Sequence, residues 1–495
     1  MLSIQSIDKR RESISIATPA QHKTELGQFL TPSIIAKFMA GLFNPLKDKE
    51  IRILDAGAGI GTLTAAFVER AACENVASLN CEVWEIDTLL ADELRITMNE
   101  CGLVMKGSGS KFSETIVFED FIESFNNLFS AKKLASHTHA ILNPPYKKIN
   151  SNSSHRFALR ALGIETTNLY SAFVALALMA LDDDGELVAI TPRSFCNGTY
   201  FRPFRELIFR IATLEKIHIF ESRTDAFKVD DVLQENVIFH LKKGKKQGAV
   251  TISSSTNATF TDLKERVIPF GQVVFPGDKE MIMHLACEDE SQSAIETMEC
   301  YTKTLEEIGV SVSTGPVVDF RLREHLCDQL KDGVAPLIYA HHFDQGLVVH
   351  PKTDAKKPNG ILICESTNKW LMPIGNYLVV RRLSSKEEKR RIIPAIFNAS
   401  HFDDQLVGFE NHLNVFHFQK KGLPLEIVKG LAIYLGSTFT DKWLRRFSGH
   451  TQVNAGDLRA LRYPDIETLA KWGKSINTAL PSQTEIDAIV EGKND

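Results

Sequence analysis

The sequence predicts an α/β protein whose N-terminal half is a doubly wound, mostly parallel sheet with helices on both faces. Strand-like apolar runs alternate with helical stretches up to about Lys245, and this alternation is typical of parallel sheets covered by helices. After that point the pattern is less regular and more polar, with short strand-like runs such as 377–380 between charged stretches. We therefore expect two domains, 1–245 and 246–495.

The first predicted strand runs into a glycine-rich loop. Asp55 is followed by Gly57, Gly59 and Gly61, and a helical stretch, 63–72, comes next. Three glycines at alternate positions let the backbone turn tightly and approach a ligand without side chains in between. The spacing differs from the dinucleotide fingerprint G-x-G-x-x-G, and no Lys-Ser/Thr pair follows to make a P-loop. A plain strand-to-helix turn, the alternative, would rarely need three glycines.

Acidic residues end the next two predicted strands. The run 81–87 contains Glu85 near its end, and the run 115–121 ends in Asp120-Phe121. An acid at the tip of the second strand is where the ribose hydroxyls of an adenosine ligand bind in doubly wound folds, although solvated strand ends also carry acids. Asp120 can accept from an exocyclic adenine amine, and Phe121 can cover the ring. These residues complete a predicted nucleotide site.

Four residues form a candidate catalytic clamp: Asn143, Pro144, Pro145 and Tyr146. They follow an apolar run, 140–142, that reads as a buried strand. Each proline fixes its own φ, and Pro145 also restricts Pro144. An Asn and a Tyr held in this way can grip a planar amide or aromatic amine while its nitrogen is alkylated. Taken alone, the four residues could also be a strand followed by a proline turn.

The remaining predicted elements continue the alternation. After the clamp come an apolar helix and three buried strands, namely 168–179, 185–192, 217–220 and 236–240. The lysine-rich run 242–246 is interpreted as the boundary between the domains. It could touch nucleic-acid phosphates, but a solvated linker is the simpler interpretation.

The chain resembles the S-adenosylmethionine-dependent DNA adenine-N6 methyltransferases. The resemblance rests on four motifs and their order: the glycine loop, the acid Glu85 at the second strand, Asp120-Phe121, and the Asn-Pro-Pro-Tyr clamp. More narrowly, the chain is similar to the Taq-type (gamma) class and, within it, to the PstI-like modification enzymes of type II restriction-modification systems. The resemblance covers essentially the whole chain and is strong for 24–240. It implies a seven-stranded class I methyltransferase sheet in 1–245 and a mixed α+β DNA-recognition domain in 246–495.

The resemblance also implies an activity and roles for residues. The enzyme would transfer the methyl group of S-adenosylmethionine to N6 of an adenine in double-stranded DNA. Thr31, at the start of a helix, would help bind the cofactor carboxylate. The side-chain oxygen of Asn143 and the carbonyl of Pro144 would accept the two N6 hydrogens, and Tyr146 would stack on the adenine. The base must first be flipped out of the duplex, and Phe227 lies about where the family places a second aromatic, although a core phenylalanine is equally plausible.

A glycine-containing segment near the C-terminus is the predicted DNA contact. Arg, His, Gln and Asn side chains are the types that read base edges and phosphates. The candidates are Arg445, Arg446, His450, Gln452 and Asn454. A capped helix-to-helix loop is the competing interpretation, and the family resemblance favours DNA contact.

Composition bounds these predictions. The net charge is −5, which does not indicate a nucleic-acid-binding protein. Phosphate binding, however, needs only a local basic face. None of the eight cysteines forms C-x-x-C, so no zinc or other metal site is indicated and a reducing compartment fits. With no 18-residue apolar run and no signal peptide, we expect a cytoplasmic protein without membrane contact. We expect a monomer, beside which a separate restriction endonuclease is plausible.

Several alternatives share some of these features. Enzymes that methylate a protein glutamine or RNA use the same clamp, but they are usually compact and lack so long a C-terminal half. A non-catalytic DNA specificity subunit would not need an intact clamp and glycine loop. A fused nuclease would need a P-D…(D/E)-x-K signature, and the acids near Pro464 have the wrong spacing.

Overall fold

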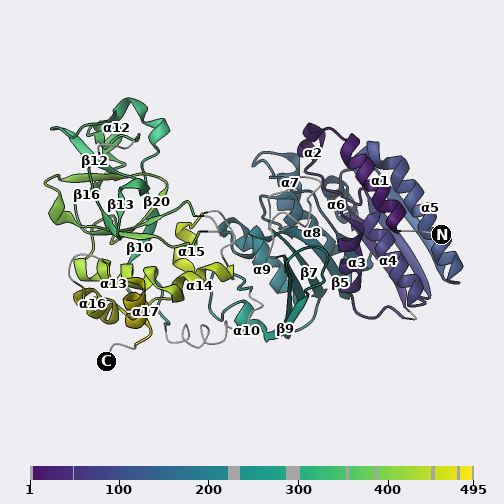
Figure 1. Cartoon of the computed structure of the whole chain (residues 1–495). Coiled ribbons are helices and arrows are strands. Elements are labelled where there is room, and N and C mark those ends of the chain that lie inside the picture. Colours follow the sequence, from purple (N-terminus) through teal and green to yellow (C-terminus); the bar gives the residue numbers. More distant parts are fainter. Residues whose placement is uncertain are drawn as a thin grey trace. The chain divides into compact units, whose positions relative to one another are not determined.

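The computed structural model describes residues 4–47, 49–220, 235–285, 301–352, 356–384, 388–447, 452–476 and 480–492 (Figure 1). The chain divides into two compact units, Met1–Cys287 and Glu288–Asp495, and each is described by itself. Among the helices described, none has both the length and the apolar character needed to cross a bilayer.

The first unit is built on a nine-stranded sheet with the order β3-β2-β1-β4-β5-β7-β6-β8-β9. The strands are β1 Glu50–Ala56, β2 Ser78–Trp84, β3 Lys111–Val117, β4 His137–Leu142, β5 Leu181–Pro192, β6 Ala212–Phe220, β7 Asn236–Lys243, β8 Ala249–Ser255 and β9 Lys264–Pro269. The pairs from β3 to β5 are parallel, and β7 runs antiparallel to both of its neighbours. The first seven strands in this order are the predicted class I methyltransferase sheet, so the predicted fold class is confirmed.

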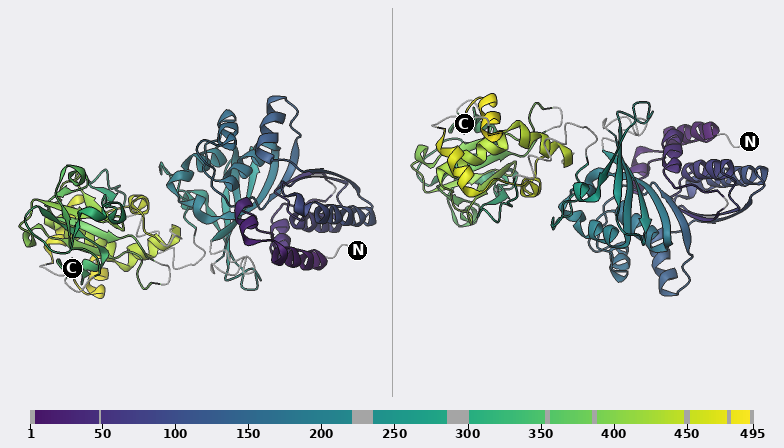
Figure 2. Two further views of the ribbon diagram at one scale, coloured as in Figure 1. Left: turned by 90° about the horizontal axis from the view of Figure 1, so that it is seen from above. Right: turned by 90° about the horizontal axis from the view of Figure 1, so that it is seen from below.

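Helices cover both faces of this sheet, and Figure 2 shows the two layers. Each face has its own buried apolar cluster. The first cluster is formed with α6 Phe121–Ser130, α7 Ser154–Ala161, α8 Leu169–Ala180 and α9 Arg202–Ile211. The second is formed with α1 Ile4–Ala17, α3 Ser33–Gly41, α4 Thr62–Cys73 and α5 Ala91–Gly107. A short helix, α2 Ala20–Leu26, links α1 to the segment before α3.

The sheet continues past Lys245, where the sequence predicted the first domain to end. β8 pairs in parallel with β6, and β9 pairs antiparallel with β8, so the compact unit reaches Cys287. The lysine-rich run 242–246 covers the end of β7 and the start of the turn to β8, and the Nζ of Lys243 donates to the carbonyl of Leu181 at 2.5 Å. The boundary lies later than expected because β6 still has an open edge after β7 has paired.

The second unit is a mixed α+β structure, as predicted for the C-terminal half. It contains a six-stranded sheet, β10-β20-β17-β18-β14-β13, and a five-stranded sheet, β11-β15-β12-β19-β16. The six strands are β10 Ser311–Thr314, β13 Phe343–Asp344, β14 Leu347–Val348, β17 Tyr377–Arg381, β18 Pro394–Phe397 and β20 Leu413–His417. The five are β11 Leu326–Cys327, β12 Val334–Ile338, β15 Gly360–Leu362, β16 Met372–Pro373 and β19 Leu406–Phe409.

After the short α12 Glu365–Asn368, the helices of the second unit lie toward the C-terminal end of the sequence. They are α13 Leu425–Gly436, α14 Thr438–Phe447, α15 Ala455–Ala460, α16 Ile466–Lys474 and α17 Gln483–Val490. α13 and α16 approach so closely that a Cβ added to Gly430 would lie 2.0 Å from the carbonyl oxygen of Leu469. Only glycine can occupy such a contact without moving one of the helices.

A buried carboxylate ties three parts of the first unit together. Glu186 in β5 accepts from the backbone N–H and the side-chain amide of Asn44, both at 2.9 Å, and from Nε2 of His240 at 3.1 Å. Burial acts to raise the pKa of Glu186. The hydrogen bonds from His240 and Asn44 together outweigh this effect, so the pKa lies well below its ordinary value. The charged form of Glu186 therefore stabilises the junction of β5, β7 and the loop after α3.

We expect Glu186→Gln to lower the free energy of unfolding by about 2 kcal/mol, because one of its two acceptor oxygens is replaced by a donor. Since the native pKa is depressed, the stabilisation is present above the unfolded value of about 4.3 and is lost as the pH falls below it. Calorimetric melting at neutral and acid pH measures both effects. Glu265→Gln, at an exposed position of β9, is the matched control, and equal melting of the two variants would contradict the prediction.

Candidate active site

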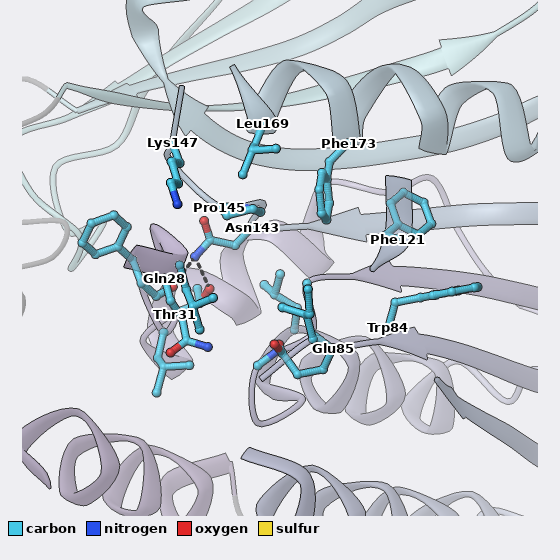
Figure 3. A pocket seen from close by; sticks show the side chains of 18 of the residues that line it. Gln28, Thr31, Trp84, Glu85, Phe121, Asn143, Pro145, Lys147, Leu169 and Phe173 are labelled. Atoms are coloured by element: carbon cyan, nitrogen blue, oxygen red, sulfur yellow. Dashed lines mark hydrogen bonds between the residues drawn. The ribbon is translucent and has the colours of Figure 1, made fainter. Parts of the chain in front are cut away.

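A pocket of the first unit lies at the edge of the sheet where the parallel strands end (Figure 3). Its lining comes from the segment before α3, the glycine loop after β1, the ends of β2 and β3, the loop after β4, and α8. Ligands of doubly wound sheets bind at this edge, because the loops leaving adjacent strands converge there. Seven of the predicted site residues line it: Thr31, Gly57, Gly59, Glu85, Asp120, Phe121 and Asn143.

The glycine loop forms one wall of the pocket. Gly57 and Gly59 have φ values of +79° and +57°, which side chains other than glycine rarely adopt. The N–H of Gly57 donates to the carbonyl of Trp84 at 2.9 Å, so the loop is held against the end of β2. A Cβ on Gly59 would lie 2.9 Å from Cδ2 of Leu30, and one on Gly57 would lie 3.8 Å from the carbonyl oxygen of Asn143. The loop and the clamp are therefore direct neighbours.

Asp55 and Gly61 lie behind the loop and are not among the lining residues. Asp55 is fully buried and accepts from Oγ1 of Thr64 at 2.7 Å. Burial raises the pKa of its carboxyl to about 7. Gly61 precedes α4 with φ +83°, and a Cβ there would meet Leu94 and Thr97 of α5 at 3.1 Å. Both residues shape the loop. The sequence predicted that they bind the cofactor, but the structure does not bring them to the pocket wall.

Glu85 is held by two backbone donors at the end of β2. Its Oε2 accepts from the N–H of Gly59 at 2.7 Å, and its Oε1 accepts from the N–H of Asp87 at 2.8 Å. Burial raises the pKa of this carboxyl. An ionised carboxylate has about four acceptor positions, so two remain for hydroxyl groups of a ligand.

Asp120 and Phe121 mark the start of α6, three residues after β3 has ended. Asp120 caps the helix by accepting from the N–H of Glu123 at 2.9 Å, and its second oxygen lies 2.8 Å from Nε2 of His155. The ring of Phe121 lies 5.1 Å from that of Phe173. His155 and Phe173 line the pocket but were not predicted, because no local sequence signal distinguishes them from a surface histidine and a core phenylalanine.

The orientation of the Asn143 side chain is fixed by the segment before α3. Its Nδ2 donates to the backbone carbonyl of Phe29 at 2.8 Å and to Oγ1 of Thr31 at 2.9 Å (dashed in Figure 3). Both amide hydrogens are therefore used. Oδ1 is buried and has no hydrogen-bond partner within the described part of the chain. An unpaired buried acceptor costs about 1–3 kcal/mol, which a donor entering the site would recover.

The other clamp residues are also locked in place. The N–H of Tyr146 donates to the carbonyl of Gly27 at 2.9 Å, and its ring lies 5.3 Å from that of Phe29 at 45°. Pro144 is buried, while Pro145 lines the pocket. The segment 27–31 thus runs along the clamp and is bonded to it at Asn143 and at Tyr146.

Two of the predicted residues, Phe227 and His450, lie outside the described residues, as does the side chain of Arg446 in α14. The structure therefore does not test Phe227 as a second aromatic wall.

The predicted DNA contacts that are described make internal contacts in the second unit. The Nε of Arg445 donates to Asp441 at 2.8 Å, and another of its nitrogens donates to the backbone carbonyl of Glu388 at 2.8 Å. Gln452 pairs with Leu383 as an isolated bridge. Asn454 caps α15. These contacts match the competing interpretation of a capped loop, and a role in DNA contact stays a prediction.

Comparison with known proteins identifies the family. Residues 88–227 match the family described as Eco57I restriction-modification methylase. The type II methyltransferase M.BsuBI of Bacillus subtilis is 45% identical over 496 residues, which cover 99% of this chain and 97% of that protein. The type II methyltransferase M.PstI of Providencia stuartii is 40% identical, over 98% of this chain and 96% of that protein.

Two solved structures share the fold at low identity. The type IIL restriction-modification enzyme MmeI in complex with DNA has a TM-score of 0.53 and 12% identity, over 93% of this chain and 72% of that chain. The DrdV–DNA complex has a TM-score of 0.52 and 13% identity, over 96% of this chain and 60% of that chain. Together with the nearly full-length identity to the two type II enzymes, the comparisons lead to one conclusion: the chain belongs to the family of type II restriction-modification methyltransferases.

Proposed function

We propose that this methyltransferase transfers the methyl group of S-adenosylmethionine to N6 of an adenine flipped out of double-stranded DNA at a specific site. The observation that carries the proposal is the Asn143 side chain, whose amide hydrogens are both bonded while its buried oxygen is unpaired. This arrangement presents an acceptor, and only an acceptor, next to the glycine loop.

The pocket residues fit S-adenosylmethionine as the methyl donor. Gly57 and Gly59 leave room for close approach, and Glu85 has acceptor positions left for ribose hydroxyls. Asp120 would accept from the adenine amine, while Phe121 and Phe173 would pack against the ring. When bound, the donor supplies a methyl group on a sulfonium, which is already an activated leaving group.

The target amine needs help because its lone pair is delocalised into the adenine ring. In the proposed reaction, Oδ1 of Asn143 and the carbonyl of Pro144 accept the two N6 hydrogens. This draws the nitrogen toward a pyramidal geometry and stabilises the positive charge that develops on it. The ring of Tyr146, which lies against that of Phe29, would pack on the base. The remaining rate gain comes from alignment of the amine with the donor.

The relatives support the rest of the proposal. M.BsuBI and M.PstI are named as type II methyltransferases, and MmeI and DrdV are described as complexes with DNA. We assign recognition of the DNA target to the second unit. We further propose that the enzyme acts as a monomer and protects host DNA from a separate restriction endonuclease. Methylation of a protein glutamine or of RNA is not favoured, because the full-length relatives are type II enzymes.

Incubation with tritiated S-adenosylmethionine and DNA that lacks N6-methyladenine tests the reaction. We expect the label in N6-methyladenine at one sequence. Label in protein or RNA alone would refute the proposal.

For the clamp, we expect Asn143→Ala to lower kcat by about 10²–10³-fold, because one of the two acceptors for the target amine is lost. Donor and DNA affinities should change little, since the second unit and the other residues that line the pocket are unaltered. Single-turnover rates and calorimetric binding separate the two effects. Asn150→Ala, at an exposed asparagine of the same loop, is the control. Unchanged turnover in Asn143→Ala would exclude the clamp mechanism.

Thr31 is expected to act through Asn143. Thr31→Val removes the hydroxyl that accepts from Nδ2, so kcat should fall by about tenfold, the effect of one hydrogen bond, whereas Thr31→Ser should remain close to wild type. The measurement is kcat and the donor KM for each variant. If Thr31→Val raised only the donor KM, the residue would instead bind the donor, as the sequence suggested.

For the glycine loop, we expect Gly59→Ala to raise the donor Kd by about tenfold or more, since the added Cβ meets Leu30 at 2.9 Å and φ is +57°. Gly109→Ala is the matched control, because Gly109 also has a positive φ, +80°, but open space around it. Calorimetric titration with S-adenosylhomocysteine checks both variants. Equal donor affinity in the two would show that the loop does not face the donor.

A further inference from the structure

His155 connects two elements that are far apart in the sheet. It lies in the first turn of α7, which follows the clamp loop after β4, and its Nε2 lies 2.8 Å from Asp120, beyond the end of β3. β3 and β4 are separated by β2 and β1 in the sheet. The contact therefore spans the pocket edge, and both side chains line the pocket.

The base of α7 is itself firmly held. Oγ of Ser153 accepts from the N–H of Arg156 at 3.3 Å and caps the helix. Arg156 and Arg160 both bond to Glu165 at the other end of the helix. His155 is thus presented from a rigid turn, and the carboxylate of Asp120 is fixed from two sides, by the Glu123 N–H and by the imidazole.

Charged groups around the pair come from three elements. Glu123 belongs to α6, Glu119 precedes it and bonds to Ser124 at 2.6 Å, and Lys147 in the clamp loop donates to the carbonyl of Glu25 at 2.5 Å. The hydrogen bond to Asp120 raises the pKa of His155, against the effect of its partial burial. Burial acts to raise the pKa of Asp120, but the hydrogen bonds from His155 and from the N–H of Glu123, together with the charge of His155, lower it below its ordinary value. The pair therefore favours imidazolium and carboxylate.

We propose that His155 is a positioning residue for the methyl donor, which orients the Asp120 carboxylate toward the exocyclic amine of the donor's adenine and fastens α7 beside that end of the pocket. This rests on the proposed function, since it assigns the adenine end of the same donor site. An anchored carboxylate keeps its remaining lone pairs in one direction, so the amine meets a preformed acceptor.

The proposal predicts a pH dependence of donor binding. Because the pKa of His155 is raised by its partner, the charged pair is complete below the ordinary histidine value of about 6.5. It is lost as the pH rises through the raised value. Donor affinity should therefore weaken as the pH rises through the raised pKa of His155, while kcat measured at saturating donor should not follow this titration.

Two substitutions of His155 test the role. We expect His155→Ala to raise the donor Kd by about tenfold at pH 6.5 and to flatten its pH dependence, with kcat at saturation within about twofold of wild type. His155→Gln can still donate to Asp120 but carries no charge, so its affinity should equal that of the wild type at high pH and remain flat with pH. Ser154→Ala, at the exposed neighbour, is the control. Wild-type Kd and pH profile in His155→Ala would overturn the proposal.

A second measurement isolates the adenine amine. S-inosylhomocysteine carries a carbonyl where S-adenosylhomocysteine carries the 6-amine. We expect the wild type to prefer the adenosyl compound by about tenfold or more, and His155→Ala to lose most of this preference. An unchanged preference in the variant would overturn the role of His155 alone. If the wild type bound neither compound, the proposed function itself would fail.

Discussion

The orientation of one amide group is the constraint on which the proposed chemistry of this site depends. A side-chain amide has a donor end and an acceptor end, and only the acceptor end can accept hydrogen from an amine. Phe29 and Thr31 take both hydrogens of Asn143, so in the proposed reaction its oxygen is the end left for the target. These partners precede Asn143 by more than a hundred residues, so the polarity of the clamp depends on the correct packing of α3 and its preceding segment against β4.

Some groups in the site lower the stability of the folded unit, and packing elsewhere in the unit offsets this cost. An unpaired buried oxygen on Asn143 and a half-satisfied Asp55 each oppose folding locally. They persist because the nine-stranded sheet and its two apolar layers hold the loops from both faces. Unpaired groups of this kind are expected where a ligand completes the hydrogen bonding.

The local sequence pattern predicted the strands that carry the site, but it did not predict where the first domain ends. The strands ending before Gly57, Glu85 and Asn143 were predicted because buried strands leave an apolar run bounded by turn residues. The domain boundary at Lys245 was placed too early, because pairing of β8 with β6 is a long-range contact that a lysine-rich turn conceals. Arg445 was predicted to contact DNA from its residue type and from the family resemblance; its guanidinium is bonded within the second unit, and the DNA contact stays a prediction.

The sequence by itself determined which chemical groups follow each strand: glycines after the first, acids after the second and third, and an Asn-Pro-Pro-Tyr clamp after the fourth. The position of a strand along the chain, the positive φ that a glycine permits and the residue types that follow a strand are local properties, so they can be inferred from neighbours in the sequence. Only the tertiary structure decided that Asp55 bonds to Thr64 behind the pocket lining, that Thr31 holds Asn143, and that His155 reaches Asp120. Hydrogen bonds between distant segments depend on how helices pack on the sheet, and no local pattern encodes that packing.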